Sequence, residues 1–107
     1  MMDPVTFAKA IADDTRQQIM HLLCCRWLCV NDVVEQIGGV TQPTVSHHLG
    51  VLREAELVHT RRDGKQVFYT LNQDAIAECC GTLLFRFAPE KVAESPFIRL
   101  QEIPVNP

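Results

Sequence analysis

The chain has 107 residues, which is the size of a single domain. It carries 10 lysine and arginine residues against 13 aspartate and glutamate residues, and 47% of its residues are hydrophobic. That apolar fraction excludes a disordered chain, and no apolar run reaches the roughly 18 residues that a membrane-spanning helix needs. Because the N-terminal segment lacks the basic and apolar regions of a signal peptide, we expect a cytoplasmic protein without a membrane partner.

Capping residues and helical spacing predict two short helices at the start of the chain. Asp3 followed by Pro4 favours a helix that runs to about residue 11. Asp13 is the predicted N-cap of a second helix, in which apolar residues recur at i, i+3 and i+4. We expect this second helix to end near residues 24–26.

The next two predicted helices form a helix-turn-helix. A short helix over 30–37 ends at Gly38 and Gly39, and a fourth helix begins after Thr41. One face of the fourth helix is apolar, and the other is small, polar and nearly free of acid, as a reader of the DNA major groove requires. The residues expected to contact base edges and the nearby backbone are Gln42, Thr44, Ser46 and His47.

A β-hairpin is predicted after the fourth helix. Two β-prone segments, 57–61 and 66–71, flank Asp63-Gly64, a strong two-residue turn signal. Residues 41–70 hold four cations against three acids, whereas 1–40 and 71–107 each have a net charge of −2. The candidates for phosphate contact near the hairpin tip are Arg61, Arg62 and Lys65. The order of elements indicates a winged helix-turn-helix, a mainly α fold with a small β-hairpin (α+β).

A last helix is predicted from near Asn72 to the stop at Pro89. Its apolar stripe is wide for a terminal helix, so we expect a second copy of the chain to cover it in a homodimer. Residues 1–89 are then the DNA-binding and dimerisation domain, and 90–107 are a proline-containing tail that we expect to be poorly ordered or draped over the surface. The stripe consists of Ile76, Cys79, Cys80, Leu83, Leu84 and Phe87.

Five cysteines form two adjacent pairs and one single residue, namely Cys24-Cys25, Cys79-Cys80 and Cys29. The odd count and a reducing compartment disfavour a disulfide framework. Three interpretations remain open: a thiolate ion site, oxidation or persulfide sensing, and plain packing. His21 precedes Cys25 by four residues, which is a workable chelating spacing on a helix, and Cys29 stands at an N-cap-like position.

The chain resembles the ArsR/SmtB family of metal- and thiol-responsive winged-helix repressors. The resemblance implies a homodimer that binds a palindromic double-stranded operator and leaves it when an inducer binds, with no enzymatic activity and no obligatory cofactor. It covers about residues 7–87 and rests on the following motifs: ADDTR at 12–16, LCVNDV at 28–33, QPTVSHHL at 42–49, LREAELV at 52–58 and RDGKQVFYTL at 62–71.

The same resemblance tests two sensor sites of the family against this chain. The third-helix thiolate site retains only Cys29, since Asn31 and Val34 stand at the matching positions of the other thiolates. The zinc site of the last helix is absent, because none of its four matching positions carries a ligand. Those positions are Gln73, Ala75, Arg86 and Pro89.

Elimination therefore leaves the two cysteine pairs as the predicted inducer site. Adjacent helical residues point about 100° apart, so Cys24 and Cys25 need a relaxed helix end and a ligand from another helix. We expect Cys79 and/or Cys80 to supply it, within one subunit or across two, with Cys29 and His21 as secondary candidates. The expected inducer is arsenite or antimonite first, then cadmium, lead or zinc.

Two alternative functions stay open. One is the same DNA-binding dimer switched by cysteine oxidation or persulfide formation. The other is a winged-helix module that binds protein, which the weak net charge permits. An enzyme is not expected, because the sequence shows no nucleophile–base pair and no substrate-cradling loop.

Overall fold

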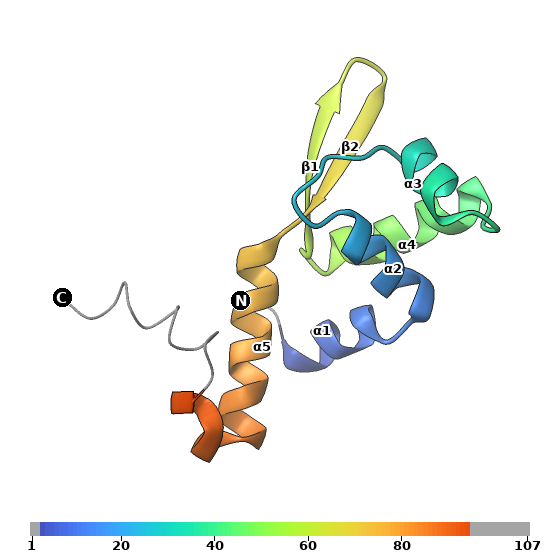
Figure 1. Cartoon of the computed structure of the whole chain (residues 1–107). Helices are drawn as coiled ribbons and strands as arrows, with labels where there is room; N and C mark the ends of the chain where they lie inside the picture. Colours follow the sequence, from blue (N-terminus) through green and yellow to red (C-terminus); the bar gives the residue numbers. More distant parts are fainter. Residues whose placement is uncertain (1–2, 95–107) are drawn as a thin grey trace.

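The computed structural model describes residues 3–94, and Figure 1 shows their arrangement. In this part of the chain, no helix is long and apolar enough to cross a membrane. The predicted order of helices and strands is confirmed. The elements are α1 (Pro4–Ile11), α2 (Asp14–Leu22), α3 (Val30–Ile37), α4 (Gln42–Glu54), β1 (Val58–Asp63), β2 (Gln66–Leu71), α5 (Gln73–Phe87) and a 3-10 helix η1 (Pro89–Glu94).

Side-chain caps fix the starts of four helices, as the sequence predicts. In each case the cap side chain accepts a hydrogen bond from the backbone N–H three residues later, which satisfies one of the unpaired donors of the first turn. The caps and their distances are Asp3 to Thr6 (3.2 Å), Asp13 to Arg16 (2.9 Å), Thr41 to Thr44 (3.4 Å) and Asn72 to Ala75 (3.2 Å).

The end of α2 differs from the expectation. The helix stops at Leu22, a few residues before the predicted end near 24–26. The carbonyl of Leu23 accepts hydrogen bonds from the backbone N–H of Leu71 (3.0 Å) and from the hydroxyl of Thr70 (3.1 Å), both in β2. Cys25 adopts a positive φ of 70°, which is incompatible with a continuing helix. The cysteine pair therefore lies in a turn after the helix.

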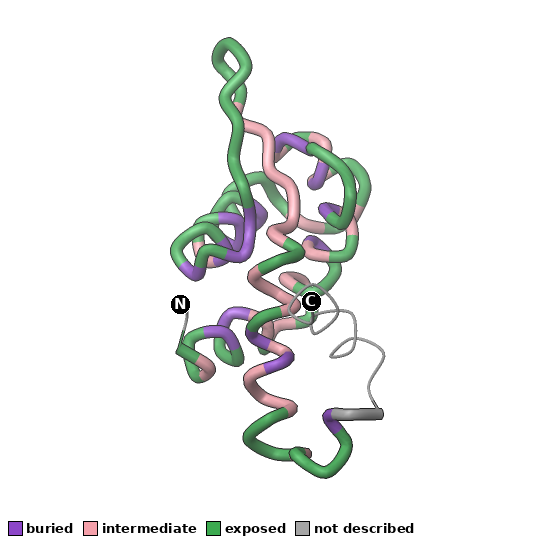
Figure 2. Tube along the Cα trace, turned by 90° about the vertical axis from the view of Figure 1, so that its left-hand side faces the viewer, coloured by how far each residue is buried: buried purple, intermediate pink, exposed green. Residues whose placement is uncertain are grey.

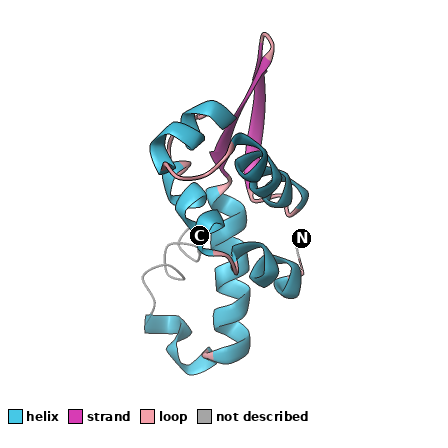
Figure 3. Cartoon of the chain, turned by 90° about the vertical axis from the view of Figure 1, so that its right-hand side faces the viewer, coloured by secondary structure: helices cyan, strands magenta, loops and turns pink. Residues whose placement is uncertain are grey.

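The hairpin loop is shifted by one residue from the predicted turn. Asp63 pairs with Gln66, so the two-residue loop consists of Gly64 and Lys65 rather than Asp63 and Gly64. Gly64 has a φ of 65° at the first loop position, where a positive φ favours glycine and matches the twist of the flanking strands. Figure 3 shows the hairpin projecting from the helical body.

The core lies between the helix-turn-helix, α2 and the base of the hairpin. Figure 2 shows buried segments in these elements and also in α1 and α5, while the hairpin tip and the C-terminal end of α5 are exposed. Phe87 and Phe85 on α5 are 79% and 59% exposed. Pro89 ends α5 as predicted and η1 follows it, so the first residues of the predicted tail are helical. Tail residues 95–107 lie outside the described part. The fully buried core side chains include Ile19, Leu23, Val33, Val45, Leu49, Leu52 and Leu57.

Candidate nucleic-acid interface and cysteine pairs

The fourth helix, α4, presents one polar face to solvent. Val45, Leu49 and Leu52 are fully buried on its inner side. The predicted DNA contacts all lie on the outer side and are exposed, namely Gln42, Thr44, Ser46 and His47. The hydroxyl of Thr41 donates a hydrogen bond to Thr44 Oγ1 at 2.9 Å, which orients the Thr44 hydroxyl in the first turn. These side chains therefore share a rigid, acid-free surface near the start of the helix.

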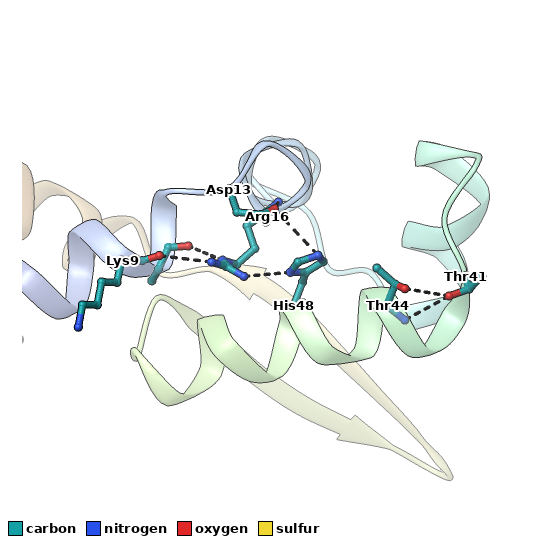
Figure 4. A network of polar contacts seen from close by, with 7 residues as sticks. Lys9, Asp13, Arg16, Thr41, Thr44 and His48 are labelled. Atoms are coloured by element: carbon teal, nitrogen blue, oxygen red, sulfur yellow. Dashed lines mark hydrogen bonds and ion pairs between the residues drawn. The ribbon is translucent and has the colours of Figure 1, made fainter.

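A polar network ties α4 to the start of α2, and Figure 4 shows it at close range. The guanidinium of Arg16 donates to the carbonyl of Ala10 (2.6 Å), to the carbonyl of Lys9 (3.3 Å) and to Nδ1 of His48 (3.0 Å). Because a guanidinium only donates, Nδ1 of His48 is the acceptor, so a neutral His48 carries its proton on Nε2. That nitrogen lies 4.0 Å from Oδ1 of Asp13.

The same network sets the charge at the start of α2. The hydrogen bond from the Arg16 backbone N–H lowers the pKa of Asp13 against an opposing effect of desolvation, and the positive charge of Arg16 lowers it further. The contact between Arg16 and His48 joins residues 32 positions apart. This contact could not be predicted from the sequence, since no local pattern links the two residues. It positions α4 against the helical body.

The hairpin of β1 and β2, called the wing below, places its three predicted phosphate contacts in different environments. The guanidinium carbon of Arg61 lies 4.6 Å from the centre of the Trp27 ring, in a cation–π contact that the sequence analysis also missed. Arg62 projects from the opposite face of β1, because successive strand residues alternate. Lys65 lies in the hairpin loop, and all three cations are exposed.

The sulfur atoms of Cys24 and Cys25 lie side by side in the turn after α2. Their Sγ atoms are 3.6 Å apart, and both residues are exposed. Nε2 of Gln73, in the first turn of α5, donates to Sγ of Cys25 at 3.3 Å. The hydrogen bond and the charge of Cys25 raise the pKa of the Cys24 thiol. The relaxed helix end that the sequence analysis required for this pair is present.

The other candidate ligands lie elsewhere. Cys79 is buried in the core, where desolvation raises its thiol pKa, and burial also raises the pKa of the half-buried Cys80. Cys29 is buried at the start of α3, and its backbone N–H donates to Asp32 Oδ2 at 3.2 Å. His21 is exposed in the last turn of α2. Within residues 3–94 of one chain, no three potential ligands gather into a metal cluster.

Comparison with known proteins places these features in a family. Residues 13–60 match the family described as "Bacterial regulatory protein, arsR family". The chain is 43% identical over 70 residues to the HTH-type transcriptional regulator KmtR of Mycobacterium tuberculosis, covering 65% of this chain and 53% of that protein. It is 43% identical over 67 residues to an arsenical resistance operon repressor of Staphylococcus aureus, covering 63% of this chain and 64% of that protein. The match thus spans about half to two thirds of these two relatives.

A third relative and a solved structure cover more of their own length. The transcriptional repressor SdpR of Bacillus subtilis is 33% identical over 76 residues, which cover 71% of this chain and 83% of that protein. The structure of reduced HlyU from Vibrio cholerae superimposes with a TM-score of 0.62 at 34% identity, covering 78% of this chain and 86% of that chain. The family comprises transcriptional regulators rather than enzymes. The chain belongs to the ArsR family.

Proposed function

We propose that the chain is a homodimeric transcriptional repressor that binds a double-stranded operator and releases it when a thiophilic ion binds cysteine thiolates. The observation that carries the DNA-binding part is the exposed, acid-free face of α4, whose orientation is held by the Arg16–His48 contact. Ser46 and His47 on that face read base edges with Gln42 and Thr44. Arg62 and Lys65 on the wing hold phosphates, together with the edge of the Arg61 guanidinium.

The exposed apolar side chains of α5 and α1 support the dimer. Phe87, Phe85 and Val5 are 79%, 59% and 57% exposed, and apolar side chains of this size are costly to leave in water. Of the predicted stripe, Cys79 packs instead in the core of its own chain. A second copy of the chain covers them and sets the spacing of the two α4 helices. Light scattering on the full chain at micromolar concentration reports a dimer, whereas a monomer that still binds operator contradicts this assembly.

The inducer is an ion or metalloid that prefers thiolates, with trivalent arsenic or antimony first and cadmium, lead or zinc next. The name of the Staphylococcus aureus relative supports arsenic. Cys24 and Cys25 supply two thiolates, and Cys79 or Cys80 supplies a third to ions that require one. Release from DNA is measured with a panel of these ions and with hydrogen peroxide, since release by peroxide alone favours the oxidation-switched alternative.

The experiment for DNA binding starts with selection of a preferred duplex from a randomised library. Fluorescence anisotropy then compares that duplex with a scrambled one. We expect His47→Ala and Ser46→Ala to weaken binding to the selected duplex by about 1–3 kcal/mol, with little effect on the scrambled one. Arg62→Ala weakens binding to both duplexes and reduces by about one the slope of the logarithm of the binding constant against the logarithm of the salt concentration. Arg86→Ala, a matched charge loss far from the wing, leaves both unchanged; equal losses in all four variants contradict the assignment.

A further inference from the structure

We propose that Cys24 and Cys25 alone form a complete bidentate site for a centre that takes two protein thiolates, typified by a monosubstituted trivalent arsenical, and that ligation there acts on the wing. The inference rests on the proposed function only for its effect on the operator. It differs from a site that must join α2 to α5, because both ligands come from one turn of one chain.

The separation of the two sulfur atoms favours chelation over oxidation. The Sγ atoms are 3.6 Å apart. Two thiolates bound to a tetrahedral zinc ion at about 2.3 Å lie about 3.8 Å apart, so the two sulfurs already lie close to the separation that a chelated centre requires. A disulfide needs about 2.05 Å between the sulfurs, and its usual Cα–Cα distance of about 4.4 Å or more exceeds the roughly 3.8 Å between adjacent residues.

The backbone of the turn brings the two sulfurs together. In a regular helix the side chains of neighbouring residues diverge by about 100°. Cys25 instead has a φ of 70°, in the left-handed region that side chains other than glycine rarely adopt. The amide of Gln73 donates to its sulfur at 3.3 Å, which ties the Cys25 side chain to the first turn of α5. A strained residue at an exposed dithiol is the kind of feature that local function, rather than packing, explains.

The turn is held at both ends by strand β2. Before the cysteines, the carbonyl of Leu23 accepts hydrogen bonds from Leu71 N and Thr70 Oγ1. After them, Leu28 and Tyr69 exchange two backbone hydrogen bonds of 3.0 and 2.9 Å in an isolated antiparallel bridge. A change in the backbone between these anchors therefore reaches the wing directly, without passing through α5.

Trp27 extends the connection to the other strand of the wing and also reports on it. It lies two residues after Cys25 and is covered by Arg61 of β1 at 4.6 Å. It is the single tryptophan of the sequence and is 37% exposed. A rearrangement of the turn alters the contact with Arg61, so Trp27 emission responds to ligation without any label.

The binding reaction needs no oxidant. An organic arsenous acid, R–As(OH)₂, reacts with two thiols to give R–As(S–Cys)₂ and two water molecules. Two As–S bonds replace two As–O bonds, and each thiol proton leaves with a hydroxyl group as water. Arsenic remains trivalent throughout. Phenylarsine oxide, which hydrates to this form, is the probe used below.

The test separates the turn pair from the other cysteines. The variant C29S/C79S/C80S keeps only the turn pair, and we expect it to bind one phenylarsine oxide by intact mass and to change its Trp27 emission. The matched variant C24S/C25S loses the emission response. Single replacements, C24S or C25S, turn chelation into one bond and weaken binding roughly 100-fold; they also serve if a double variant unfolds. An unresponsive C29S/C79S/C80S protein, or a fully responsive C24S/C25S protein, overturns the proposal.

The coupling to the wing is tested by amide chemical shifts of the full chain with and without the probe. We expect shifts at Leu28, Tyr69 and Leu71; shifts confined to α5 overturn the coupling. Operator binding by the unliganded wild-type chain is measured in parallel. If no selected duplex is bound, the proposed function fails while probe stoichiometry still decides the site. If operator is bound and the probe releases it equally from C24S/C25S, the inference fails and the proposed function stands.

Discussion

The two cysteine pairs place the same dipeptide in two different backbones. Cys24-Cys25 follows Leu23, the C-cap residue of α2, and both side chains are exposed with their sulfurs 3.6 Å apart. Cys79-Cys80 lies inside α5, where Cys79 packs in the core and Cys80 is half-buried. Adjacency in sequence therefore does not decide whether two thiols act together. The backbone decides it, because only a turn can bring neighbouring side chains to one side.

The two cysteine pairs also differ in the physical cause that raises their thiol pKa values. Desolvation raises the pKa of Cys79 and Cys80, and the neighbouring charge of Glu78 adds to the effect at Cys79. The pKa of Cys24 is raised mainly by the hydrogen bond with Cys25, and desolvation is the smallest of its causes. Ligation of the turn pair replaces the hydrogen bond between the two thiols, so it removes the main cause of the raised pKa of Cys24. Ligation of Cys79, in contrast, requires a local opening of α5 that exposes a core residue.

The largest difference between the pairs is expected in alkylation. Iodoacetamide should modify the turn pair at least roughly 100-fold faster than Cys79, because Cys79 must be exposed by local opening before it reacts. The rate at Cys24 should rise with pH, since its raised pKa leaves less thiolate at neutral pH. Peptide mass spectrometry after timed quenching measures each site. Equal rates at Cys24 and Cys79 contradict the assigned burial.

A smaller difference is expected in stability. Cys79→Ser places a hydroxyl among apolar core side chains and should lower the free energy of unfolding by about 1–2 kcal/mol. Cys24→Ser, at an exposed site, should change it by less than about 0.5 kcal/mol. Urea denaturation of the two variants, with the wild type as reference, gives both values. If Cys24→Ser proves the more costly change, the turn pair has a packing role that its exposure does not reveal.

Local signals in the sequence suffice for most of the fold. A cap residue such as Asp13 or Thr41 needs only the N–H three residues later, so its role is visible in a short window. The hairpin was predicted for the same reason, and the one-residue shift of its loop reflects the pairing of Asp63 with Gln66. Predicted helix ends are wrong where a strand distant in the sequence contacts the chain, as β2 does at the end of α2.

The candidate sites were predictable only in part. The exposed face of α4 follows from helical periodicity, so the exposure of Ser46 and His47 was predictable, while their contact with DNA stays a prediction. The contact of Arg16 with His48 and the stacking of Arg61 on Trp27 join residues 32 and 34 positions apart. Such pairs depend on tertiary packing and leave no periodic trace. The site joining both cysteine pairs stays a prediction, since one chain does not assemble it within residues 3–94.

The finest comparison replaces one cysteine of each pair by glycine. At Cys25, with a φ of 70°, glycine removes a left-handed strain of about 1 kcal/mol. It also adds chain entropy to the unfolded state, which costs about 0.5–1 kcal/mol, so the net change should lie between zero and a stabilisation of about 0.5 kcal/mol. Cys80→Gly, inside α5, should destabilise by about 1 kcal/mol or more, because no strain is relieved and the half-buried side chain loses its packing. Cys24→Gly is the matched control, since Cys24 has no positive φ. Urea midpoints measure all three variants. If Cys25→Gly is as unstable as Cys24→Gly, the strained turn forms only when the two thiols contact each other. The sulfur atoms would then determine the conformation of the backbone, rather than the backbone determining the positions of the sulfur atoms.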